Sequence, residues 1–294
     1  MISDQDNLII HPTKDGSLTF FSQEFNEAFH SNFGAKQESY QKFAFPTQVK
    51  TLAKTGKVKI LDVCYGLGYN TAAALEVIWQ ENSDCFVEVM GLEINSVVPQ
   101  TAINENIFSD WDERYIKILT DLAFENYCYG DRLQAKLFIG DARKTIQEIR
   151  TSGFLADAIF LDPFSPPQCP QLWTIEFIEN VVLCLSPTGL LATYSCAAAV
   201  RTALLNAGLI IGSTAPVGRR TPGTIAAYPQ YREQEIKNTY PLSQAEIEHL
   251  QTRAAIPYRD PQLTDPAEII IQRRQQEQEN SNLEPTSQWR KRWN

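Results

Sequence analysis

The sequence predicts an α/β protein with a Rossmann-like, seven-stranded mixed sheet and helices on both faces. The first observation is an apolar run of strand length, residues 58–63, which turns through two glycines into a helix-forming segment. The second is the alternation of strand and helix patterns from there to residue 208. The third is a closing pair of strands, residues 209–216 and 224–228, with no helix between them. Crossover helices give parallel neighbours, whereas a closing hairpin adds antiparallel ones.

The turn after the first strand indicates a ligand site. It has the sequence Tyr65-Gly66-Leu67-Gly68-Tyr69-Asn70. Gly66 and Gly68 lack a Cβ, so the backbone can take positive φ values and approach a ligand closely. The turn lacks the third glycine of a dinucleotide fingerprint and the lysine of a P-loop, which favours a ligand without a pyrophosphate. S-adenosylmethionine is the commonest such ligand of this architecture, and a tight turn without a ligand is the alternative.

Acidic residues follow the second and third strands. The second strand, residues 85–93, ends on Glu93, about 25 residues beyond the glycine turn. A carboxylate there can accept hydrogen bonds from both hydroxyls of a ribose, although a solvated acid at a strand end would look the same. The third strand, residues 135–139, leads to Gly140 and Asp141. Asp141 can accept from an adenine amino group or cap the following helix, and both roles are compatible.

The fourth strand, residues 157–161, has the most distinctive ending. It leads into Asp162-Pro163-Phe164, a loop stiffened by two further prolines. Pro163 has no N–H and disfavours a helical conformation at Asp162, so we expect the Asp162 carboxylate to point into the crevice. A carboxylate offers acceptors only, which suits an amine, and Phe164 offers a flat face to a planar ring. The alternative is a purely structural loop.

Composition restricts the possible partners. The net charge of −9 is unlike that of a general nucleic-acid binder, so contacts with phosphates would need a local basic patch. Arg219 and Arg220, in the loop between the last two strands, are the best candidates for it. Six cysteines without a C-x-x-C pair and three scattered histidines predict no metal site. No signal peptide or membrane-spanning run is visible, which predicts a cytoplasmic protein.

Two flanking regions complete the predicted organisation. Residues 1–57 should form a hairpin and helix that pack on the catalytic domain, residues 58–228. In the first region, Phe25, Phe29 and Phe33 recur every four residues and predict a helix with an aromatic stripe, more simply explained as core. Residues 229–294 should form a helical appendage, with helices near 243–253 and 266–279 and a frayed tail.

With these motifs in this order, the chain resembles the MnmC-type tRNA methyltransferases over residues 8–228. The most specific part is residues 160–166, Phe-Leu-Asp-Pro-Phe-Ser-Pro, after the glycine turn and Gly140-Asp141. The resemblance implies a class I S-adenosylmethionine-dependent methyltransferase fold. It further implies N-methylation of the 5-aminomethyl group of the tRNA wobble uridine, giving 5-methylaminomethyl(-2-thio)uridine. Pro163 stands where the family usually has glycine, and residues 221–223 replace a more basic run.

The resemblance also assigns roles. Asp162 becomes the catalytic residue, and Phe164, Arg219 and Arg220 belong to the substrate side. The cofactor-binding residues are Tyr65, Gly66, Gly68, Asn70, Glu93 and Asp141. The partner is the anticodon loop of tRNA. No oxidase domain of the kind fused in some family members is visible, so a separate enzyme would supply the aminomethyl-uridine intermediate.

Two other functions are compatible with the same sheet. A polyamine-synthase-like aminopropyltransferase also has an acid at the end of the fourth strand, but it needs several carboxylates around a polycationic acceptor. A non-catalytic RNA-binding scaffold would bind cofactor without turnover.

Overall fold

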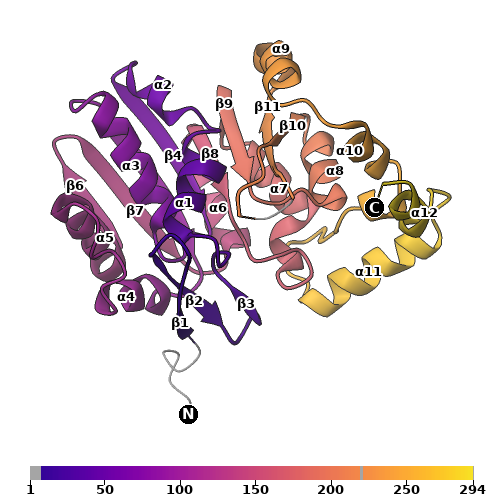
Figure 1. The fold of residues 1–294 in the computed structure, drawn as a ribbon, viewed down its shortest axis with the longest axis horizontal. Helices are drawn as coiled ribbons and strands as arrows, with labels where there is room; N and C mark the ends of the chain where they lie inside the picture. The colour runs from indigo at the N-terminus through magenta and orange to yellow at the C-terminus, as the bar shows by residue number, and fades with distance from the viewer. Residues whose placement is uncertain (1–7, 219–220, 294) are drawn as a thin grey trace.

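The structure, a computed structural model, describes residues 8–218 and 221–293 (Figure 1). At its centre is an eight-stranded sheet with the order β10-β11-β9-β8-β4-β5-β7-β6. Its strands are β4 (Lys57–Val63), β5 (Phe86–Glu93), β6 (Tyr127–Gly130), β7 (Leu133–Ile139), β8 (Ala156–Leu161), β9 (Leu185–Thr193), β10 (Ile210–Thr214) and β11 (Gly223–Ala227). Arg219 and Arg220, which are the predicted contacts for phosphates, lie outside the described residues.

The sheet is mixed, as the sequence predicts. Five adjacent strands of the sheet are mutually parallel, namely β9, β8, β4, β5 and β7. Strand β11 runs antiparallel to both β9 and β10, which confirms the closing hairpin.

The predicted count of seven strands is wrong, because β6 adds an antiparallel edge strand beside β7. Its four residues, Tyr-Cys-Tyr-Gly, are too few and too exposed to give a periodic apolar pattern.

Helices cover both faces of the sheet, and their apolar sides form two cores. One core contains side chains of α3 (Tyr69–Glu81), α4 (Val97–Asn104) and α5 (Glu113–Glu125). The other contains side chains of α6 (Ala142–Thr151), α7 (Ile175–Val182) and α8 (Ala198–Asn206). Successive residues of β4 alternate between the two, with Ile60 in the first and Leu61 in the second, as expected for a strand buried on both sides.

The N-terminal segment forms a small layer of its own. Its elements are β1 (Leu8–Pro12), β2 (Leu18–Ser22), β3 (Glu27–Ala28), α1 (Ala35–Glu38), the π-helical turn η2 (Ser39–Ala44) and α2 (Val49–Ala53). The helix predicted through Phe25, Phe29 and Phe33 is wrong. Asn26 has a positive φ of 49°, and the Phe29 N–H donates to the carbonyl of Phe20, so the chain turns back along β2.

Much of the C-terminal segment is helical. It contains α9 (Pro229–Thr239), α10 (Gln244–His249), the 3₁₀ turn η4 (Arg253–Ala255), α11 (Ala267–Glu279) and α12 (Thr286–Trp293). The frayed tail is a wrong prediction, because α12 docks on α10: the Trp289 indole donates to the Ala245 carbonyl at 2.8 Å and stacks on His249. None of the helices in the described ranges is long and apolar enough to cross a membrane.

Gly212 in β10 provides a test of this packing. A Cβ at this position would lie 2.5 Å from the carbonyl oxygen of Tyr240, just after α9, so backbone would have to move. We expect Gly212→Ala to lower the free energy of unfolding by about 1–3 kcal/mol. Gly130→Ala is the matched control, since a Cβ there meets nothing within 4 Å, and its effect should stay within about 0.5 kcal/mol. Urea unfolding measures both, and equal effects would contradict the packing described.

Candidate active site

A pocket opens at the carboxyl ends of the parallel strands, where α/β sheets bind their ligands. Of the residues predicted from the sequence, those lining it are Tyr65, Gly66, Asn70, Glu93, Asp141, Asp162 and Phe164. Gly68 is not among the lining residues. It precedes α3 with a φ of 98°, and a Cβ there would lie 2.6 Å from the Tyr65 hydroxyl, so its missing side chain makes room for Tyr65.

The glycine turn brings the Gly66 N–H to Glu93 in the pocket wall. Cys64, Gly66 and Gly68 all have positive φ values. Because Cys64 carries a Cβ, its φ of 68° is the strained one, and strain of this kind gathers at functional sites. The Gly66 N–H donates to Glu93 Oε2 at 2.8 Å, which joins the ends of β4 and β5.

Glu93 is held rigidly at the end of β5. Its side chain is 6% exposed, and Oε1 accepts a second backbone hydrogen bond from Asn95 at 3.0 Å. Burial raises the pKa of Glu93, while the N–H groups of Asn95 and Gly66 act in the opposite direction. Each oxygen keeps a further lone pair, so the carboxylate can also accept from ribose hydroxyls.

Three buried polar atoms of residues that line the pocket have no hydrogen-bond partner among the described residues. They are the Tyr65 hydroxyl, Asn70 Oδ1 and Gln171 Oε1. A buried polar group without a partner costs free energy, and such groups in native proteins call for an explanation such as a ligand. The wall therefore fits S-adenosylmethionine, which offers both hydrogen-bond donors and acceptors. No group of three or more His, Cys, Asp or Glu in the described ranges is arranged to hold a metal ion.

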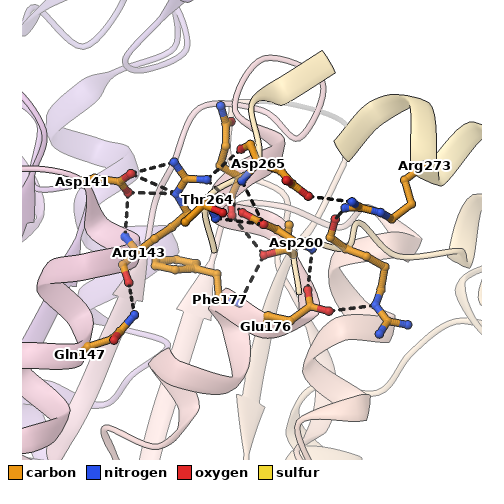
Figure 2. A network of polar contacts seen from close by, with 12 residues as sticks. Asp141, Arg143, Gln147, Glu176, Phe177, Asp260, Thr264, Asp265 and Arg273 are labelled. Atoms are coloured by element: carbon orange, nitrogen blue, oxygen red, sulfur yellow. Dashed lines mark hydrogen bonds and ion pairs between the residues drawn. The ribbon is translucent and has the colours of Figure 1, made fainter. Parts of the chain in front are cut away.

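Asp141 lines the pocket from the turn after β7, and Arg143 surrounds it with donors (Figure 2). Asp141 caps α6 by accepting from the Arg143 N–H at 2.9 Å. The Arg143 guanidinium donates to both carboxylate oxygens, through Nε at 3.1 Å and Nη2 at 2.7 Å. Burial opposes ionisation of Asp141, but the hydrogen bonds from Arg143 outweigh it and lower the pKa. Of the two compatible roles, the structure shows the cap, and the adenine contact stays a prediction.

Asp162 follows β8 directly and is fixed from two sides. Its N–H donates to the Val63 carbonyl at 3.1 Å, and Asn70 Nδ2 donates to Asp162 Oδ2 at 2.9 Å. The next peptide is also held, because the Tyr194 hydroxyl donates to the Pro163 carbonyl at 2.9 Å. The carboxylate therefore keeps its direction in the pocket wall without depending on side-chain rotamers alone.

An aromatic group closes the pocket on the side of the N-terminal layer. Phe164 stacks on Phe25 with ring centroids 4.6 Å apart and meets Phe29 edge-on at 4.9 Å. The Ser165 N–H and hydroxyl both donate to Glu27 Oε2, at 3.0 and 2.6 Å. The sequence pattern assigns Phe25 and Phe29 to a core stripe and misses this role. Phe25 and Phe29 share this environment, but Phe33 does not line the pocket and is 38% exposed, so the spacing does not reveal which rings meet the loop.

Lys42 is a further lining residue, although its position in the sequence suggests at most a weak candidate for contact with phosphates. It comes from η2, is only 2% exposed and lies in the same wall as Glu38. A lysine within a helical pattern usually indicates a solvated face, so no local signal could have placed it inside a pocket.

Comparison with known proteins agrees with this description. Residues 102–229 match a family described as S-adenosyl-L-methionine-dependent methyltransferases. The crystal structure of MnmC2 from Aquifex aeolicus is 33% identical, with a TM-score of 0.76, and covers 91% of this chain and 84% of that one. An uncharacterized protein of Methanocaldococcus jannaschii is 29% identical, and the match covers 92% of this chain and 72% of the relative.

Longer relatives match as well. One is the tRNA 5-methylaminomethyl-2-thiouridine biosynthesis bifunctional protein MnmC of Methylibium petroleiphilum, 25% identical over 74% of this chain. The match spans only 35% of that relative's length.

The fold and the site thus define an S-adenosylmethionine-dependent methyltransferase. Within that class, the chain belongs to the MnmC-type methyltransferases, as its likeness to MnmC2 over nearly the whole length shows.

The role of Glu93 can be tested by cofactor binding. In Glu93→Gln, the amide NH₂ would face a backbone N–H of Gly66 or Asn95, so the carboxylate's hydrogen bonds cannot all be replaced. We expect the affinity for S-adenosylmethionine, measured by calorimetry, to fall by about 1–3 kcal/mol. Glu88→Gln is the control, because Glu88 lies on the same strand beside Lys59, away from the pocket. Unchanged affinity in Glu93→Gln would refute the ribose assignment.

Proposed function

We propose that the protein methylates the 5-aminomethyl group of the wobble uridine in a tRNA anticodon loop, giving 5-methylaminomethyl(-2-thio)uridine. The observation that carries the proposal is the Asp162 carboxylate, held by Asn70 in a pocket wall between the glycine turn and Phe164. Relatives named for 5-methylaminomethyl-2-thiouridine biosynthesis, and the likeness to MnmC2, support this choice of substrate.

Two acceptors are suited to orient a primary amine. Asn70 donates through Nδ2 to Asp162, which leaves Asn70 Oδ1 without a partner among the described residues. An amine can donate one N–H to the Asp162 carboxylate and the other to Asn70 Oδ1, which directs its lone pair away from both. S-adenosylmethionine, when bound, supplies an electrophilic methyl group. The overall reaction gives a secondary amine, S-adenosylhomocysteine and one proton, which Asp162 is placed to accept.

Most of the rate acceleration should come from positioning. A neutral amine needs little activation, so holding it in line for attack contributes more than acid–base chemistry. The rigidity of Asp162, fixed through its own N–H and through Asn70, serves this purpose.

The aromatic group formed by Phe25, Phe29 and Phe164 suits the uracil ring. Bases in single-stranded loops are commonly bound by stacking on aromatic side chains. A wobble base already lies in such a loop, so turning it into a pocket costs less than extracting it from a duplex. The three rings come from two segments far apart in the sequence, which gives the pocket a preformed apolar side.

Binding of the tRNA needs concentrated positive charge, because the net charge of the chain is −9. We assign this role to Arg219 and Arg220, which lie outside the described residues. A tRNA substrate also implies the cytoplasm as the compartment. A separate enzyme would supply the aminomethyl-uridine.

The aminopropyltransferase alternative needs several carboxylates available to a polycationic acceptor. Acids do line the pocket, but Glu27 is occupied by Ser165, and Glu93 and Asp141 are assigned to the cofactor and not to the acceptor. Two cations, Lys42 and Arg143, line the same pocket. This arrangement favours a single amine over a polyamine.

Substitution of Asp162 tests the proposed chemistry. We expect Asp162→Ala and Asp162→Asn to lower methyl transfer to tRNA lacking the final methyl by about 10²- to 10⁴-fold, with little change in cofactor affinity. Nucleoside mass spectrometry measures the product. Asp157→Asn is the control, since Asp157 lies near the beginning of β8 and accepts from the Lys59 N–H at 2.9 Å.

Full activity in both Asp162 variants would make that residue structural. A wild-type chain that binds S-adenosylmethionine but methylates no such tRNA would favour the non-catalytic scaffold.

A further inference from the structure

Through residues 258–265, the C-terminal segment contacts Arg143, which lines the predicted cofactor site. This stretch lies along the beginning of α7: the Ile175 N–H donates to the Tyr258 carbonyl at 3.1 Å, and the Asp260 N–H donates to Glu176 at 2.8 Å. Figure 2 shows Asp260 and Asp265 close to Arg143, on the side of the guanidinium away from Asp141.

Asp260 is a fully buried carboxylate, with 0% exposure. Its Oδ1 accepts from the N–H groups of Thr264 and Asp265, both at 3.1 Å. Its Oδ2 accepts from Arg143 Nη1 at 3.0 Å. Removing a carboxylate from water is costly unless it has partners, and here both carboxylate oxygens accept hydrogen bonds.

Arg143 links this carboxylate to Asp141. Its Nη1 donates to Asp260 and to the Asp265 carbonyl, at 3.0 and 2.9 Å, while Nε and Nη2 face Asp141. A guanidinium is planar and its donors have fixed directions, so the contacts on one side determine where the other side points. Asp260 therefore sets the plane in which Arg143 meets Asp141.

We infer that Asp260 is a positioning residue for purine recognition, which it achieves through Arg143 and Asp141. Held in this way, Asp141 presents acceptors to the 6-amino group of adenine, and a 6-oxo purine would meet them with its own acceptor. The inference rests on the proposed cofactor function and extends it to the C-terminal segment, which thereby contributes to ligand specificity.

Attachment of the C-terminal segment to the rest of the chain does not by itself explain why an aspartate is buried there. The segment has other attachments to the rest of the chain, including the ion pairs of Arg259 with Glu176 and of Glu246 with Arg201. A buried aspartate is therefore not required merely to tie the appendage down. The lowered pKa of Asp141, which burial opposes and Arg143 enforces, keeps that carboxylate an acceptor only.

Binding of two ligands to the full chain tests the inference. Calorimetry is carried out with S-adenosylhomocysteine and with S-inosylhomocysteine, which has an oxygen in place of the 6-amino group. The wild type should prefer the adenosyl ligand. In Asp260→Asn, which keeps the shape and removes the charge, we expect about tenfold weaker binding of S-adenosylhomocysteine and a smaller preference between the ligands.

Arg292→Ala is the matched control. It removes contacts of the same appendage, to Glu248 and Glu284, at residues that do not line the pocket. Both affinities should stay at the wild-type values. Arg143→Lys keeps the charge but loses the planar set of guanidinium donors. It should reduce the preference for the adenosyl ligand as Asp260→Asn does, and it provides the test if Asp260→Asn fails to fold.

Equal loss of affinity for both ligands, or none, would overturn the inference. The calorimetry contains no tRNA. A failure to methylate tRNA would therefore contradict only the proposed substrate and would leave the inference about Asp260 unaffected. A wild-type chain that binds neither ligand would overturn the cofactor assignment and the inference together.

Discussion

The hydrogen bond from the Gly66 N–H to Glu93 is the contact around which the site is organised. It ties the ends of β4 and β5 together where the chain leaves the sheet in a strained turn, with Cys64 at a φ of 68°. The same glycine turn determines where α3 begins and therefore where Asn70 lies. The Asn70 side chain holds Asp162 at the end of β8. One buried carboxylate thus fixes the relative positions of three strand ends.

Segments outside the central sheet complete the surroundings of the pocket. The N-terminal layer contributes Phe25 and Phe29, and its Glu27 binds the loop after Asp162. The C-terminal segment contributes Asp260 behind Arg143. The strand ends therefore supply Asp141 and Asp162, whereas the surroundings of these two carboxylates depend on residues more than a hundred positions away.

The sequence predicts the centre of the sheet well because β4 and β8 are buried along most of their length and therefore give apolar runs. Asp162 and Glu93 could be singled out because they follow such runs. The edge strand β6 is too short and exposed to leave a pattern. Phe25, Lys42 and Asp260 could not be placed, because their surroundings come from long-range contacts that local spacing does not encode. Helix α12 was missed for the same reason, since it is held by α10 rather than by an apolar face of its own.

The span of these contacts along the chain has a consequence for folding. Glu27 and Ser165 are separated by 138 positions, and Arg143 and Asp260 by 117. Contacts of such large sequence separation form late, because closing long loops costs entropy before the contacts reward it. During synthesis the β4–α3 unit leaves the ribosome long before residue 260 does. The nascent protein therefore passes through a stage in which the sheet can form while Arg143, in the wall of the ligand site, still lacks its partner Asp260.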